Sequence, residues 1–198
     1  MPPLCGYVYA MGTAPLIVHL RNTLNEQLER AKALRELPMV LIEQRPAPKK
    51  WSVLEICEHM NLSCGHYLIH LRKAYEHPGS LFARSEVHRP GFWGGKLTRT
   101  MRPTEDGRIK LPMPTLGIFE PRLAPVKRLA ALDEFIEMLE GYRALLDVAA
   151  TRGMEGPRIT STLGPLFRFK VADAFSFAIA HQERHMLQID RTIGALRA

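Results

Sequence analysis

The chain has 198 residues, of which 46% are hydrophobic and 24% charged, and its formal net charge is +7. This composition excludes a disordered, collagen-like or low-complexity protein, and the length predicts one domain whose core needs no disulfide. Because no apolar run approaches about 18 residues, and because the basic residues are spread with no run longer than Lys49-Lys50, we expect neither a membrane span nor a nucleic-acid partner.

The first helix is expected to follow a short extension. Residues 1–13 carry no Lys or Arg and are expected to be flexible, with a single helical domain over 14–198. A helix is predicted over 15–37, because apolar residues recur there at three- and four-residue steps and form one stripe. The stripe consists of Leu16, Leu20, Leu24, Leu28 and Ala31.

A second helix is predicted over 52–76. Ser52 is a favourable N-cap, and Glu55 three residues later completes a capping box. Trp51, directly before the cap, is expected to be a packing anchor between helices. The sequence His77-Pro78-Gly79 ends the helix, because proline cannot continue it.

The segment 78–125 has no helical periodicity and is rich in proline and glycine. We expect a long irregular connection between the second and third helices, which is unusual in a compact domain and often functional. Two interpretations remain open. Its residues Phe92, Trp93, Phe119 and Arg122 either face a substrate from a wall or lid of a pocket, or cover the exposed end of the helices.

Two further helices are predicted, over 126–151 and 171–196, with a loop containing proline and glycine between them. No segment shows the alternation of apolar and polar residues that is typical of a half-buried strand. Four long helices with both short and long connections predict an all-α fold, namely a helical bundle.

The clearest chemical motif is a histidine pair in the fourth helix, His181 and His185. Positions i and i+4 share one face of a helix, so both imidazoles point toward one place, and imidazole is a common ligand of zinc and related metals. The HExxH motif of zinc proteases is excluded, because Gln182 stands where that motif needs glutamate. The pair is either half of a metal site or two histidines on a polar face.

A third ligand would have to come from another helix. The second helix offers His59, and His66, His70 and His77 lie on nearly the same face. His66 and His70 are about 10 Å and about 16 Å from His59 along the helix axis, which is too far to share its metal. His77 stands at the helix end, where a structural role is expected.

Two segments resemble a known family. The sequence WSVLEICEHM at 51–60 resembles the W-S-x-x-E-x-x-x-H signature of the DinB-like metalloenzymes. The sequence HQERHMLQI at 181–189 resembles their closing motif, H-x-x-R-H-x-x-Q-I. The two motifs open the second helix and fill the fourth, in the order that the family has, and the resemblance covers about 16–196.

The resemblance implies a four-helix bundle of the DinB-like type, commonly a homodimer. Carried over by position, its metal ligands would be His59 from the second helix and His181 and His185 from the last. Three histidines leave an open coordination position, which is the catalytic rather than the structural pattern. Zinc, nickel and iron(II) all suit this set of ligands.

Glu55 and Gln188 are candidates to orient the ligand imidazoles through their second ring nitrogens. Glu55 lies one helical turn before His59, and Gln188 lies close to the face that carries His181. The alternative for Glu55 is the capping box alone. The alternative for Gln188 is an ordinary surface or interface residue.

Characterised DinB-like proteins include transferases and isomerases that use a low-molecular-weight thiol. The resemblance therefore implies a metal-dependent enzyme that acts on a small-molecule substrate, either a thiol-dependent S-transferase or a hydrolase. The alternative is a non-enzymatic dimeric binding or stress-response protein, since no proton-transfer residue is evident beside the histidines. The three cysteines, Cys5, Cys57 and Cys64, form no CxxC motif and are expected to be reduced, as in a cytoplasmic protein.

Overall fold

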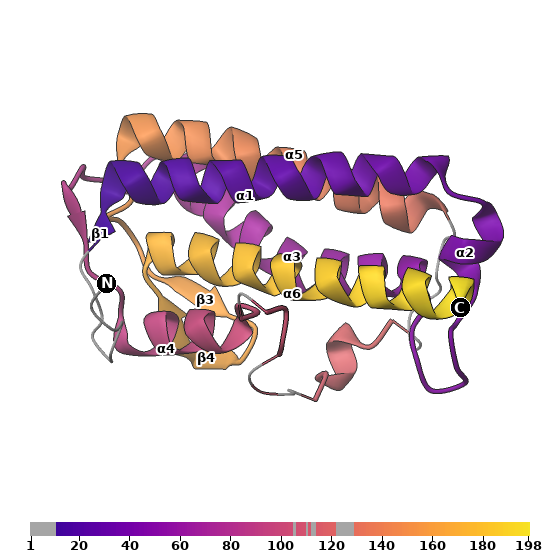
Figure 1. The fold of residues 1–198 in the computed structure, drawn as a ribbon. Helices are drawn as coiled ribbons and strands as arrows, with labels where there is room; N and C mark the ends of the chain where they lie inside the picture. The colour runs from indigo at the N-terminus through magenta and orange to yellow at the C-terminus, as the bar shows by residue number, and fades with distance from the viewer. Residues whose placement is uncertain (1–10, 105, 110, 112–113, 122–128) are drawn as a thin grey trace.

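The computed structural model describes residues 11–198 apart from 105, 110, 112–113 and 122–128 (Figure 1). The described residues are mostly helical, as predicted, and none of their helices combines the length and apolar character that crossing a bilayer needs. The helices are α1 (Thr13–Ala33), α2 (Met39–Glu43), α3 (Val53–Glu76), α4 (Phe92–Met101), α5 (Leu129–Arg152) and α6 (Val171–Arg197). The short elements are the strands β1 (Met11–Gly12), β2 (Val87–His88), β3 (Ile159–Ser161) and β4 (Gly164–Phe169), and the 3₁₀ turns η1 (Leu34–Glu36) and η2 (Gly117–Phe119).

The four long helices, α1, α3, α5 and α6, lie side by side, with α1 and α5 above α3 and α6 in the view of Figure 1. All members of the apolar stripe predicted for the first helix are buried in the core between them. Burying one such side chain contributes about 1.5–3 kcal/mol. Packing of these faces, more than intrinsic helix propensity, therefore holds the helices in place.

The helix boundaries follow their capping residues and prolines. At the start of α3, Ser52 Oγ accepts a hydrogen bond from the Glu55 backbone N–H, and Glu55 Oε2 accepts one from the Ser52 N–H, so the predicted capping box is present. The first helix is shorter than predicted. It ends at Ala33 and tightens into η1, because Pro38 disfavours helical backbone before it. The predicted start of the third helix at 126 lies outside the described residues.

The segment 78–125 is not irregular throughout, contrary to the prediction, because it contains β2, α4 and η2. The residues Gly94 and Gly95 lower the helix propensity of α4 and hide it in the sequence. Gly94 is required by packing, since a Cβ atom there would lie 2.5 Å from the Asp173 side chain of α6. Contact between α4 and α6 therefore overrides the local preference.

A β-hairpin formed by β3 and β4 was also not predicted. The two strands have three and six residues, and buried positions do not alternate with exposed ones along β4, so the sequence lacks the period-2 pattern. Gly164 begins β4 with φ +113°, a conformation that L side chains rarely adopt. A second strand pair joins β1 to β2, with Met11 opposite His88.

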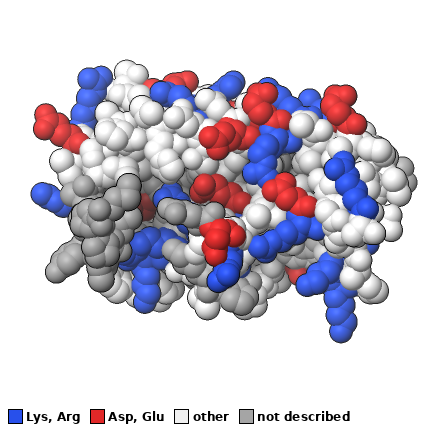
Figure 2. Space-filling model, in the orientation of Figure 1, with Lys and Arg blue, Asp and Glu red and all other residues white. Residues whose placement is uncertain are grey.

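Charged side chains of both signs are interspersed on the face of α1 and α6 shown in Figure 2. Several ion pairs join one helical element of the chain to another. They include Arg21–Asp147, Arg30–Asp190 and Arg35–Asp133. Because exposed ion pairs contribute only about 0–1 kcal/mol each, they add little to the cohesion that the apolar core provides.

Candidate metal centre

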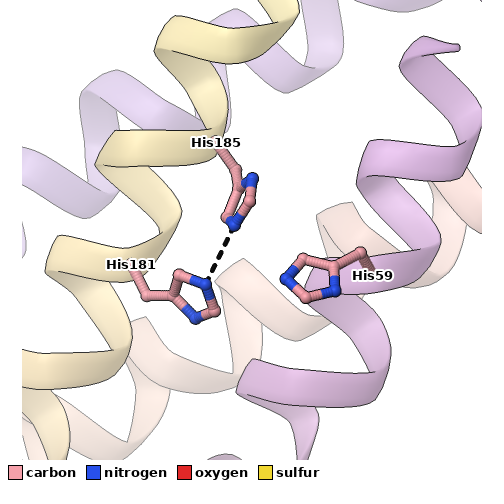
Figure 3. Close-up of side chains that lie close together, drawn as sticks. All are labelled: His59, His181 and His185. Atoms are coloured by element: carbon pink, nitrogen blue, oxygen red, sulfur yellow. Dashed lines mark hydrogen bonds between the residues drawn. The ribbon is translucent and has the colours of Figure 1, made fainter. Parts of the chain in front are cut away.

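Three imidazoles converge between α3 and α6 (Figure 3). His59 comes from α3, and His181 and His185 come from successive turns of α6. One ring nitrogen of each lies within 4.8 Å of the others, and Nε2 of His181 is 2.9 Å from Nε2 of His185. The arrangement brings together the three residues that the sequence nominated as ligands, and together they could hold a metal ion.

Burial keeps these imidazoles neutral. Burial, reinforced by the neighbouring His59, lowers the pKa of His181 to about 3. Burial and the other two histidines place the pKa of His185 well below its ordinary value. The pKa of His59 is also lowered by burial, although its hydrogen bond to Phe119 opposes the shift. Neutral imidazole is the form that ligates metals, so the cluster is in the correct protonation state at neutral pH.

The outer nitrogens of two rings are held by oxygen acceptors. His59 Nδ1 donates to the backbone carbonyl of Phe119 at 2.8 Å, and His185 Nδ1 donates to Gln188 Oε1 at 2.8 Å. A neutral imidazole that donates from Nδ1 has its lone pair on Nε2. Both rings therefore direct an Nε2 lone pair toward the centre of the cluster, as metal-ligating histidines usually do.

The outer nitrogen of the third ring faces sulfur. His181 Nδ1 lies 3.7 Å from Cys64 Sγ, and burial raises the pKa of this thiol to about 12, so it stays protonated. Because His185 Nε2 is an acceptor, His181 Nε2–H donates to it in the metal-free chain and leaves His181 Nδ1 unprotonated. Cys64 Sγ lies 3.7 Å from both this nitrogen and the Ala178 carbonyl, so its S–H can donate to either. Ion binding would move the His181 proton to Nδ1, where the Cys64 sulfur accepts it.

The structure does not bring Glu55 to a ligand histidine. Its carboxylate accepts the Ser52 N–H and pairs with Arg45 of the preceding loop, which together with the capping box occupies both oxygens. Arg45 also offsets the effect of burial and holds the pKa of Glu55 below its ordinary value. The Phe119 carbonyl occupies the position beside His59 that Glu55 was a candidate to fill.

A pocket of about 660 Å³ opens over the three histidines. Its described walls come from α3 and residues 49–51 before it, from α6, from Met101 of α4, from the turn between β3 and β4, and from Ile109 and residues 114–120. The Trp51 ring lies over the cluster, with its centroid 5.0 Å from that of His59 and 6.5 Å from that of His185. Trp51 therefore shields one side of the cluster from water and forms a wall of the pocket.

The candidates for substrate contact are placed differently from one another. Phe119 lines the pocket through η2, whereas Phe92 and Trp93 are exposed on α4 and contact each other outside the described lining. Trp93 packs against Phe167 of the hairpin. Arg122 lies outside the described residues.

Some residues at the site were not predicted from the sequence, because no sequence motif marks the groups through which they act. The Phe119 carbonyl is a backbone atom, and Cys64 belongs to no cysteine motif. Glu120 and Arg184 line the pocket without having been candidates. The one available signal was that Arg184 occupies the arginine position of the closing motif.

A model of the DinB superfamily matches residues 19–189, which include all three histidines and both of the resembling segments. The chain belongs to the DinB superfamily. No curated protein and no solved structure matches it. For this DinB-superfamily chain, the resemblance seen in the sequence is therefore confirmed at the level of the family.

The residues at this DinB-superfamily site fit a metal ion. Three neutral imidazoles meet, two of them buried and that of His181 partly buried, and two of the rings have their outer nitrogens held by oxygen acceptors. In the metal-free chain, the inner nitrogens can satisfy one another only through the single bond between His181 and His185. A cation at the centre would satisfy all three lone pairs, which the described protein groups do not.

Proposed function

We propose that this DinB-superfamily chain is a metal-dependent enzyme that acts on a small molecule in the pocket over His59, His181 and His185. The observation that carries the proposal is the convergence of three neutral imidazoles beneath an open pocket of about 660 Å³. Structural zinc sites are usually closed by four protein ligands, whereas catalytic sites keep a position for water or substrate. A three-histidine set beside a pocket follows the catalytic pattern.

The proposed cofactor is zinc, nickel or iron(II), since imidazole suits each of them. When bound, such an ion lowers the pKa of an adjacent water or thiol, which supports either hydrolysis or thiol-dependent S-transfer. We further propose that the four long helices form the four-helix bundle of the superfamily. The bundle assignment rests on the family and on the packing of α1, α3, α5 and α6.

The chain's own groups have separate tasks in this proposal. The Phe119 carbonyl and Gln188 hold protons on the outer nitrogens of His59 and His185, and Trp51 limits the access of water. Glu120 is the one carboxylate in the described lining of the pocket, and its Oε1 accepts a hydrogen bond from Trp51 Nε1 at 3.1 Å. Glu120 is therefore the side chain placed to accept a proton from a substrate.

Metal analysis of the purified chain tests the proposal. Wild type prepared without a His-tag or nickel column should hold about one equivalent of metal, and His59→Ala should hold much less, because one of three ligands is lost. His70→Ala is the matched control, since His70 lies on the same helix and contacts His66 instead of the cluster. It should retain the wild-type content, and circular dichroism should show all three proteins folded.

Two outcomes would contradict the proposal. One is equal metal content in wild type and His59→Ala. The other is a wild type that holds no metal after zinc, nickel or iron(II) is supplied, which would favour a non-enzymatic binding protein. A positive result justifies screening for hydrolysis, and for transfer with and without an added low-molecular-weight thiol.

A further inference from the structure

A second pocket, of about 490 Å³, adjoins the pocket over the histidines. The two pockets share five lining residues, among them Trp51, Arg184 and Gln188. The second pocket follows α6 toward its C-terminus, where Thr192 and Ala195 line it. A ligand that reaches the histidines could therefore extend past Trp51 along α6.

The second pocket is positively charged. Lys50, Arg184 and Arg191 are in its described lining, which contains no acidic side chain. The first pocket adds Lys49 and the single acid Glu120. Lys50 and Arg184 therefore line both pockets, while Arg191 lines the second pocket alone and Glu120 the first alone.

Arg184 lines both pockets and has no counter-ion among the described residues. Its side chain is partly buried. Nη1 donates to the Leu111 carbonyl at 2.9 Å, but no ion pair among the described residues includes Arg184. A carbonyl orients a guanidinium without neutralising it, so a partly buried cation remains to be compensated.

Several other arginines of the chain pair with a carboxylate, whereas Arg184 has no such partner among the described residues. Six of the described arginines do so: Arg21 with Asp147, Arg30 with Asp190, Arg35 with Asp133, Arg45 with Glu55, Arg102 with Glu183, and Arg108 with Asp106. Arg191, like Arg184, has a backbone carbonyl as its partner, that of Gly107 at 2.8 Å, and no acidic partner among the described residues. Both arginines in the described lining of the second pocket therefore lack a carboxylate partner among the described residues.

We propose that the second pocket is an anion subsite, in which Lys50, Arg184 and Arg191 bind a carboxylate or phosphate group of the small molecule. The reactive part of the same molecule would then lie over the three histidines, and this part of the inference rests on the proposed function. Guanidinium groups suit this task because their planar N–H groups match carboxylate and phosphate oxygens. The volume of the pocket, about 490 Å³, lies within the range of small-molecule sites.

Anion binding to the full chain tests the subsite. We would titrate three probes by calorimetry: succinate, inorganic phosphate, and succinamide as the neutral counterpart of succinate. Each titration is run on the metal-free and on the zinc-loaded protein, so that binding to the side chains is separated from binding to the ion. Succinate or phosphate should bind at least about tenfold more tightly than succinamide in both forms, and added salt should weaken the binding.

Variants locate the binding. Arg184→Gln and Lys50→Gln should each weaken binding of the anion about tenfold, because each removes one charged contact. Lys50 is exposed, so Lys50→Gln disturbs the fold less than Arg184→Gln, which also removes the hydrogen bond to the Leu111 carbonyl. Arg143→Gln, on an exposed position of α5 outside both pockets, should bind like wild type.

The outcomes separate this inference from the proposed function. Equal affinity for succinate and succinamide, with no binding of phosphate, overturns the subsite, and so does anion binding that neither Arg184→Gln nor Lys50→Gln weakens. Normal zinc content with no anion binding would remove the subsite and leave the metal site standing. Anion binding by a chain that takes up no zinc would support the subsite and remove the metalloenzyme. A preference for succinate or for phosphate identifies the anionic group.

Discussion

The proton on each ring decides whether the three histidines can receive an ion. His59 and His185 donate from Nδ1 to oxygen acceptors in either state. His181 has to exchange an Nε2 proton for an Nδ1 proton, and its Nδ1 faces Cys64. A thiol serves both states, because it donates to a bare nitrogen and accepts from a protonated one. Cys64 is therefore a positioning residue for His181.

We predict that Cys64→Ala weakens zinc binding by about tenfold, since loss of a partner to a metal-ligating histidine typically costs 10–100-fold in affinity. Cys57→Ala is the matched control, because Cys57 is equally buried in α3 but has no described histidine contact. Cys64→Ser should retain more affinity than Cys64→Ala, since a hydroxyl also donates and accepts. Competition with a chromophoric chelator measures all three. Equal losses in Cys64→Ala and Cys57→Ala would show a packing effect alone.

Among the elements, α4 is attached to the rest of the fold through a buried carboxylate at the start of α6. Asp173 Oδ2 accepts the Gly91 N–H at 2.9 Å, at the N-terminus of α4, and Asp173 Oδ1 lies 3.2 Å from His88 Nε2. Gly94 lies directly against the same side chain. The absence of a side chain at Gly94 is therefore what lets α4 approach α6.

We predict that Gly94→Ala destabilises the chain by about 1–3 kcal/mol, because the new methyl group would overlap Asp173. Gly65→Ala is the matched control in α3, where a Cβ atom would meet nothing within 4 Å. It should stabilise the chain by about 0.5–1 kcal/mol, through the higher helix propensity of alanine. Urea denaturation gives both values. Changes of the same sign in the two variants would contradict the packing argument.

Stability of the whole molecule should depend on the neutral state of the cluster. An unfolded histidine has a pKa of 6.5, whereas burial lowers the pKa of His181 to about 3 and lowers those of His59 and His185. Below pH 6.5, the unfolded chain therefore binds more protons than the folded one. The stability is fully present above the unfolded pKa and is lost as the pH falls toward the folded values.

We predict that the unfolding free energy of the metal-free chain falls from about pH 6.5 downward, by up to about 1.4 kcal/mol per pH unit for each histidine that stays neutral. Urea denaturation at a series of pH values measures the slope. The variant His181→Gln should have a smaller slope, because one buried titrating group is gone, while the carboxylates are common to both proteins. A slope as steep as that of wild type would contradict the prediction.

The long helices could be predicted because local periodicity encodes their buried faces, and the histidine set because its spacing and two motifs are visible in the sequence. That these histidines bind a metal remains a prediction. The sequence did not reveal α4, because the glycine at position 94 is required by a contact with Asp173, which is distant along the chain. The acceptor beside His59 was equally hidden, since the Phe119 carbonyl lies 60 residues away and reaches His59 through the packing of η2 against α3.

The three histidines come from two helices that are about 120 residues apart along the chain. An ion shared by α3 and α6 would act as a cross-link that closes this loop, with the same entropic effect on the unfolded chain that a disulfide has. The buried cysteines in α3 are both free thiols, so sulfur does not make that link. A link of this kind forms and opens with the supply of metal instead of the redox state, so the protein's resistance to unfolding would follow the free metal concentration around it.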